Sequence, residues 1–136
     1  MISSYGSRRD YEAMAGVGVD AWSPERWAEV GALMEAFNRE LAESGELVET
    51  RAFTSPADTR RLTLVDGVPA VTDDPAGEGL SPTAYWVVDC PSLDRAIGIA
   101  RRLLTEGGTV DVRPIAGSRH ELAGSAEDRR SWDNPT

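Results

Sequence analysis

The sequence predicts an α+β domain in which an antiparallel sheet carries two main helices on one face. Three observations predict it. Two segments place apolar residues at helical spacing, several short segments alternate in polarity, and one Asp-Gly pair separates two of those short segments. The chain has 136 residues, which is enough for one domain with its own core.

A short strand is expected at residues 2–6, followed by a long amphipathic helix over residues 24–44. Ser23 can cap this helix, Pro24 suits its first position, and Gly45 ends it. The apolar face is formed by residues spaced three and four apart, namely Trp27, Val30, Met34, Phe37 and Leu41.

Three strands and two turns are predicted next. Residues 47–53 alternate in side-chain type, and residues 55–58 form a turn. Residues 60–65 and 68–72 flank Asp66-Gly67, which is typical of a tight hairpin turn. The two strands are therefore expected to pair antiparallel.

The last third of the chain is predicted to contain a loop, a strand, a helix and a strand. Residues 73–82 are rich in Asp, Pro and Gly and form the loop. Residues 84–90 form a buried central strand, residues 93–106 a helix that ends at a Gly pair, and residues 109–115 a closing strand. Residues 116–136 are expected to form a polar C-terminal tail.

This element order predicts a ferredoxin-like sandwich in residues 1–115. In the central strand, Trp86 and Val88 lie on one side and Tyr85 and Val87 on the other. Because both sides are apolar, we expect the sheet of a second subunit to cover the face that the helices leave open.

Composition excludes several classes of function. The chain has one cysteine, one histidine and no lysine, so a Schiff base and a closed zinc site of nitrogen and sulfur ligands are excluded. The net charge of −9 argues against a nucleic-acid partner. Without a leader-like or membrane-spanning apolar run, and with one unpaired cysteine, the chain is expected in the cytoplasm.

Four stretches make the sequence resemble the YCII-related domain family, in the branch marked by an Asp-Gly-Pro-Phe motif. They are the end of the first helix at residues 38–47, the hairpin and following turn at 66–75, the central strand at 85–94, and the closing strand at 110–115. The resemblance implies a dimeric α/β barrel of ferredoxin-like subunits, with a cavity between the sheet and the partner subunit.

The signature loop departs from the pattern of that family. Asp74 stands where the family has glycine, and Ala76 where it has an aromatic residue. Some relatives are thought to use a His-Asp pair, but the sole histidine here, His120, lies in the predicted tail.

Three carboxylates within six positions of this loop, Asp73, Asp74 and Glu78, are candidates for chemistry. Neighbouring carboxylates can raise one another's pKa and act as acid or base, and they can also gather a hard cation. The alternative is a solvated turn in which Asp73 caps backbone amides. We predict catalytic roles for Asp73 and Glu78, a substrate contact for Asp74, and no resident metal.

Three arginines and two tyrosines are candidates for holding the substrate. Arg51, Arg61 and Arg113 fall on predicted strands and could bind an anion through forked hydrogen bonds, or else form surface ion pairs. Tyr5 and Tyr85 could line the cavity, or else pack in the core with a satisfied hydroxyl.

Two functions remain open from the sequence. The first is a cofactor-independent enzyme of lyase or isomerase type, possible in secondary metabolism, that acts on a small molecule. The second is a non-catalytic small-molecule-binding or regulatory accessory protein. Both predict a homodimer with a small-molecule ligand and without nucleic acid or membrane. A third possibility is a structural dimer with a relic pocket, which predicts no saturable ligand.

Overall fold

The computed structural model describes residues 1–104 and 108–123. In chain order its elements are β1 (Ile2–Gly6), α1 (Arg8–Met14), α2 (Pro24–Glu43), β2 (Leu47–Ala52), a 3-10 turn (Pro56–Asp58), β3 (Arg60–Val65), β4 (Val68–Asp73), β5 (Ser81–Val88), α3 (Leu93–Arg101) and β6 (Thr109–Val112). The predicted α+β class with an antiparallel sheet is confirmed.

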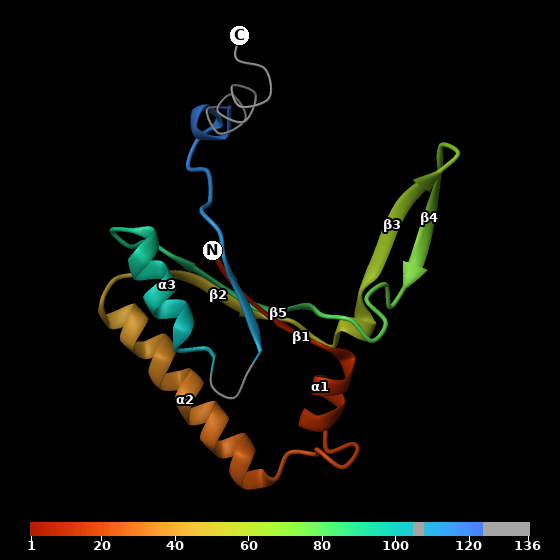
Figure 1. The fold of residues 1–136 in the computed structure, drawn as a ribbon, viewed down its shortest axis with the longest axis horizontal. Helices are drawn as coiled ribbons and strands as arrows, with labels where there is room; N and C mark the ends of the chain where they lie inside the picture. Colours follow the sequence, from red (N-terminus) through yellow and green to blue (C-terminus); the bar gives the residue numbers. More distant parts are fainter. Residues whose placement is uncertain (105–107, 124–136) are drawn as a thin grey trace.

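The main sheet has four strands in the order β2-β5-β1-β6, and every neighbouring pair is antiparallel. This order is compatible with a ferredoxin-like fold. Helices α2 and α3 lie together on one face of the sheet (Figure 1). Strands β3 and β4 pair only with each other in a separate two-stranded sheet, the hairpin arm, which stands away from the main body (Figure 1).

The core lies between the sheet and the two helices. Ile2, Leu41 and Ile99 are almost fully buried, and the rings of Phe37 and Trp86 meet edge to face with centroids 5.8 Å apart. The indole nitrogen of Trp86 donates to Asn38 Oδ1 at 2.8 Å, so its polar edge is satisfied inside the core.

The helix starts follow local sequence signals. The Ser23 hydroxyl accepts from the Arg26 amide, and α2 begins at Pro24, as predicted. Helix α1 is not among the predicted elements, although Ser7 and Asp10 form a reciprocal capping box at its start. The helix is missed because it has only seven residues and no buried residue, so it lacks an apolar period.

Three predicted boundaries are wrong by a few residues. Strand β5 begins at Ser81 instead of residue 84, because Ser81 and Pro82 pair with β1 across a bulge. Helix α3 ends at Arg101, ahead of the predicted residue 106, which lies outside the described residues. Strand β6 ends at Val112, two residues before Pro114, which has no amide hydrogen to donate.

The predicted tail contains helical residues at 119–123, with the Ser118 hydroxyl accepting from the Glu121 amide. Residues 124–136 of that tail lie outside the described residues. Within the ranges that the structure describes, no helix combines the length and the apolar character needed to cross a bilayer.

Candidate functional site

The face of the main sheet that points away from α2 and α3, the open face, carries one residue from each strand in a row. Cross-strand pairing places Arg51 opposite Tyr85, Tyr85 opposite Ser3, and Ser3 opposite Asp111. Paired residues lie on the same side of a sheet. Because Ile2, Trp86 and Val112 form the neighbouring row on the core side, this row belongs to the open face.

The adjoining residues extend the open face in both directions. Val87 pairs with Glu49, and the Arg113 amide continues the ladder beyond β6 by donating to the Met1 carbonyl oxygen at 2.8 Å. Tyr5 pairs with Thr109 and lies two residues after Ser3 on β1, so it is on the same side of the sheet. Four of the predicted binding residues, Tyr5, Arg51, Tyr85 and Arg113, therefore come from four different strands or strand ends to one surface.

The Tyr5 hydroxyl is tied to β6. A hydrogen bond to the Asp111 carboxylate is the main cause that raises the pKa of Tyr5 above its ordinary value of 10.0. Removal from water also raises this pKa, and the Arg113 charge opposes the shift. Tyr5 consequently stays protonated at neutral pH and acts as a hydrogen-bond donor.

The other end of the row is aromatic and cationic. The Tyr85 and Phe53 rings lie tilted with centroids 5.8 Å apart. Arg51 Nη1 donates to the Thr50 carbonyl oxygen, while its Nη2 lies 3.6 Å from Glu49 Oε1. Two-thirds of the Arg51 side chain remains exposed, so this guanidinium is available to a ligand or partner.

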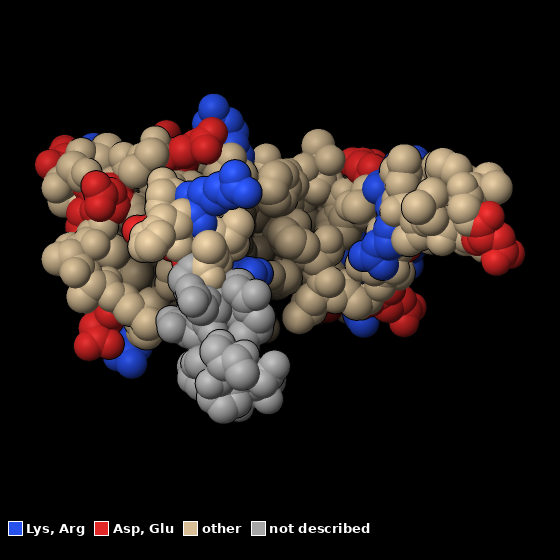
Figure 2. All heavy atoms as spheres, turned by 90° about the horizontal axis from the view of Figure 1, so that it is seen from above, with Lys and Arg blue, Asp and Glu red and all other residues tan. Residues whose placement is uncertain are grey.

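The surface on this side of the sheet is hollowed. The hairpin arm and residues 113–123 both rise from it, away from the helices (Figure 1). Figure 2, which looks down on this side, shows mainly uncharged atoms between the hairpin arm and the main body, with basic and acidic side chains along the edges. A partner that fits this surface would therefore enter between two raised margins.

The predicted carboxylates lie elsewhere, at the base of the hairpin arm. Asp73 is the last residue of β4 and lies opposite Arg60 of β3. Its Oδ1 forms an ion pair with Arg60 Nε at 3.0 Å, and 79% of the Asp73 side chain is exposed. Glu78 borders a small hollow with Arg8, Arg9 and other residues of α1. Within the described residues, no three of His, Cys, Asp and Glu gather in a metal-binding arrangement.

Asp74 ties this loop to α1. Its Oδ2 accepts from Arg8 Nη1 at 2.6 Å, and its amide donates to the Thr59 carbonyl oxygen. The backbone φ of Asp74 is +45°, the left-handed region that glycine adopts without strain. The contacts of Asp74 are therefore those of a loop anchor.

Arg61 lies on the hairpin arm opposite Thr72 and is exposed, so it does not belong to the open face. Residues that the prediction missed are Ser3, Glu49 and Asp111. Asp111 could have been found, because Val110-Asp111-Val112-Arg113 alternates and puts Asp111 and Arg113 on one side of a strand.

Comparison with known proteins adds nothing to these contacts, because no protein-family model and no curated protein matches the chain.

Proposed function

We propose that two copies of this chain pair through their open faces and that the cavity between them binds a small organic anion. The observation that carries the proposal is the convergence of Tyr5, Arg51, Tyr85 and Arg113 on a face that no described helix covers. Guanidinium groups and the Tyr85 hydroxyl are donors for a carboxylate or phosphate, whereas the single hydroxyl hydrogen of Tyr5 is donated to Asp111.

Charge on the open face supports a second copy as the partner. The chain carries a net charge of −9, yet this face holds two acids, Glu49 and Asp111, beside two arginines, Arg51 and Arg113. A twofold interface presents the same patch from both sides, so it must be self-complementary. A locally balanced patch meets that requirement.

The hairpin arm supports the same pairing. Its apolar residues Leu62, Leu64 and Val71 are 67%, 72% and 61% exposed, and a lone two-stranded hairpin is only marginally stable in water. Because the arm rises beside the open face, it would lie against a second copy docked there. The proposed assembly is the dimeric α/β barrel that the family resemblance implies.

Binding without catalysis is the form of this proposal that the contacts favour. The proposed catalytic groups, Asp73 and Glu78, lie at the base of the hairpin arm, and Asp73 is paired with Arg60. A lyase or isomerase activity needs these two carboxylates to reach the bound anion. Turnover that survives in Asp73→Asn and Glu78→Gln with a verified substrate would remove those roles.

The dimer is tested by light scattering of the full chain. A mass of about twice 14.7 kDa is expected, and Arg113→Glu, which unbalances the open face, should shift the mass toward 14.7 kDa. A monomer at every concentration of the unmodified chain would overturn the pairing.

The ligand is tested by calorimetry with benzoate as the probe anion. Arg51→Gln and Arg113→Gln should each weaken binding by roughly tenfold to a hundredfold, since they remove charge-assisted hydrogen bonds. Arg39→Gln on exposed α2 removes the same charge elsewhere and should leave affinity unchanged. Equal losses in all three variants would show that only net charge attracts the anion.

A further inference from the structure

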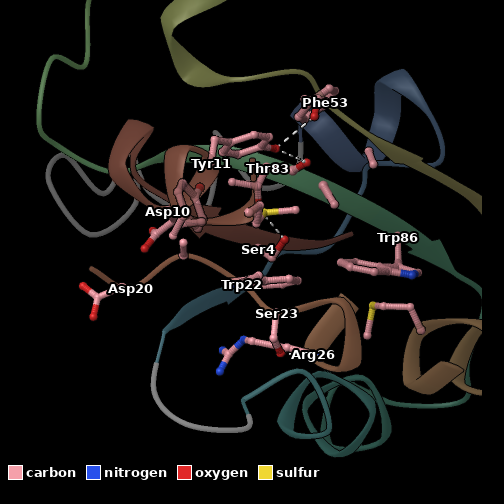
Figure 3. Close-up of a pocket in the computed structure, with 18 residues that line it drawn as sticks. Ser4, Asp10, Tyr11, Asp20, Trp22, Ser23, Arg26, Phe53, Thr83 and Trp86 are labelled. Carbon is pink, nitrogen blue, oxygen red and sulfur yellow. Dashed lines mark hydrogen bonds between the residues drawn. The ribbon is translucent and has the colours of Figure 1, made fainter. Parts of the chain in front are cut away.

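A second cavity lies on the opposite side of the sheet from the open face. It has a volume of about 910 Å³ and is bordered by α1, residues 20–23, the start of α2, and one end of the main sheet (Figure 3). Of the predicted site residues, Tyr5 alone borders it, at the end of β1, and none of the predicted carboxylates and arginines does. Ligand pockets commonly have volumes of roughly 300–1,000 Å³, so this cavity has the size for a small organic molecule.

The cavity exists because the core-facing side chains change size along the same strands. At one end of the sheet, Ile2 and Val88 are large and belong to the packed core. At the other end the corresponding positions are Ser4, Gly6 and Ala84, which fill much less volume. Interiors pack at nearly crystalline density, so small residues here leave space that no core side chain fills.

Helix α2 does not close this space. Phe37 and Leu41 are its buried residues, and Met34 is partly buried beside them. The start of the helix runs away from the sheet, as Figure 1 shows, and Trp27 is 47% exposed. The cavity thus lies between the diverging end of α2 and the short helix α1.

Aromatic side chains form its walls. Figure 3 shows the Trp22 ring crossing the space below Ser4, with the Trp86 ring at the far side and Tyr11 above. Flat rings on several sides provide stacking surfaces for a flat ligand.

These walls are fixed by contacts of their own. The Trp22 amide donates to the Ala13 carbonyl oxygen at 2.8 Å, and the Trp22 and Trp27 rings meet at 5.2 Å. The Tyr11 hydroxyl donates to the Phe53 carbonyl oxygen at 2.9 Å, which joins α1 to the end of β2. A ligand would therefore enter a largely preformed site and lose less affinity to ordering of the protein.

The floor of the cavity holds a pair of hydroxyl groups. Ser4 Oγ and Thr83 Oγ1 lie 2.9 Å apart, so one of them donates to the other. The second hydroxyl keeps its hydrogen for another acceptor, because a pair of hydroxyls has two hydrogens and their mutual bond uses one. A carbonyl or hydroxyl oxygen on a ligand would accept it.

The charged groups around the cavity are already engaged. The Asp10 carboxylate accepts from the Ser7 amide at 2.7 Å, and Asp20 lies at the outer edge, 3.9 Å from Arg9. The Arg26 guanidinium lies over the Trp22 ring at 4.8 Å. The interior is therefore aromatic with one polar corner, which favours an uncharged ligand.

We propose that this aromatic pocket binds a small, flat, uncharged aromatic molecule that carries one carbonyl or hydroxyl oxygen. The Ser4–Thr83 hydroxyl pair donates to that oxygen, and the rings of Trp22 and Trp86 flank the ligand. The site lies on the helix side of the sheet and needs only one copy of the chain, so it stands apart from the anion site proposed for the open face.

The test uses 2-naphthol and naphthalene as probes of the full chain, measured by calorimetry and by quenching of tryptophan fluorescence. Both should bind saturably, with 2-naphthol tighter. Thr83→Val keeps the side-chain volume and removes the hydroxyl, so it should weaken 2-naphthol by about threefold to tenfold and leave naphthalene unchanged. Thr63→Val on the exposed hairpin arm is the matched control and should change neither affinity.

Two further variants locate the ligand. Ala84→Leu fills the pocket and should abolish binding of both probes, while circular dichroism checks its fold. Arg113→Glu on the open face should leave both affinities unchanged, even if it dissociates a dimer. The proposal is overturned if the unmodified chain binds neither probe, if Thr83→Val weakens both probes equally, or if Arg113→Glu abolishes binding.

Discussion

The two faces of the main sheet differ in whether residues of the same chain cover them. On the helix side, Ile2, Trp86 and Ile99 are at most 5% exposed, and one chain supplies all the residues that bury them. On the open face, Arg51 and Asp111 remain exposed, although they belong to the row of residues next to the buried one. The same strands thus contribute to a buried core on one face and to an uncovered surface on the other, because alternate residues point to opposite sides.

The largest change in the free energy of unfolding is expected from a substitution in the core on the helix side of the sheet. Leu41→Ala should lower the free energy of unfolding by about 2–5 kcal/mol, because Leu41 is 1% exposed and its removal leaves a cavity. Leu64→Ala on the hairpin arm removes an equal volume from an exposed site and should cost under about 0.5 kcal/mol in the monomer. Urea denaturation measures both, and a large loss for Leu64→Ala would show that the arm is covered in solution.

If the open face is a dimer interface, the stability of the chain should depend on protein concentration. If a second copy covers the open face, a roughly hundredfold rise in concentration should raise Tm by about 4 °C or more, because association stabilises the folded state. Scanning calorimetry measures this shift. Arg113→Glu should flatten the dependence, and a constant Tm for the unmodified chain would mean that the open face stays uncovered.

A smaller, pH-dependent contribution to stability is expected from the ion pair between Glu46, just before β2, and Arg95 of α3. Arg95 donates to both oxygens of Glu46 and, together with Ser44, lowers the pKa of Glu46 from 4.5 to about 2. The contribution of this pair is complete above pH 4.5 and disappears as the pH falls toward 2, because Glu46 in the unfolded state has the higher pKa and takes up the proton first. The stability difference between the chain and Glu46→Gln should close over that window, and a constant difference would contradict the pairing.

The smallest expected effect is a change in the pKa of one open-face residue, Tyr5. Asp111→Ala should bring the pKa of Tyr5 down toward 10.0, because it removes the hydrogen-bond acceptor that raises that pKa. Ultraviolet titration of the tyrosinate measures the shift. The change should disappear in a Tyr5→Phe background, and its persistence there would assign it to Tyr11 or Tyr85.

Local signals predicted the elements whose ends are marked in the chain. Ser23-Pro24 fixed the start of α2, and Asp66-Gly67 fixed the hairpin, whose two turn residues have φ of 51° and 79°. Strand β3 was predicted to the residue, whereas β5 was predicted to begin three residues late. The difference arises because Ser81-Pro82 reads as a turn and becomes a strand only through its partner β1.

The candidate site was predictable in part. Alternation within a strand showed that Tyr85 and Trp86 must face opposite ways. It could not show that Arg51, Tyr85, Ser3 and Asp111 form one row, because the strand order β2-β5-β1-β6 brings together residues that are far apart in the chain. For the same reason the closeness of Asp73 to Glu78 in sequence did not predict their contacts, which are with Arg60 and with the α1 region.

The sequence by itself determined the α+β class, most of the strands and both long helices, since caps, turns and polarity periods act over a few residues. Only the tertiary structure decided which strands are neighbours, which face lacks a cover, and where Ser4, Gly6 and Ala84 leave a cavity beside Trp22. The physical reason is the distance along the chain over which each interaction acts. Hydrogen bonds within turns and caps are local, whereas burial and pairing depend on groups that only the folded chain brings together.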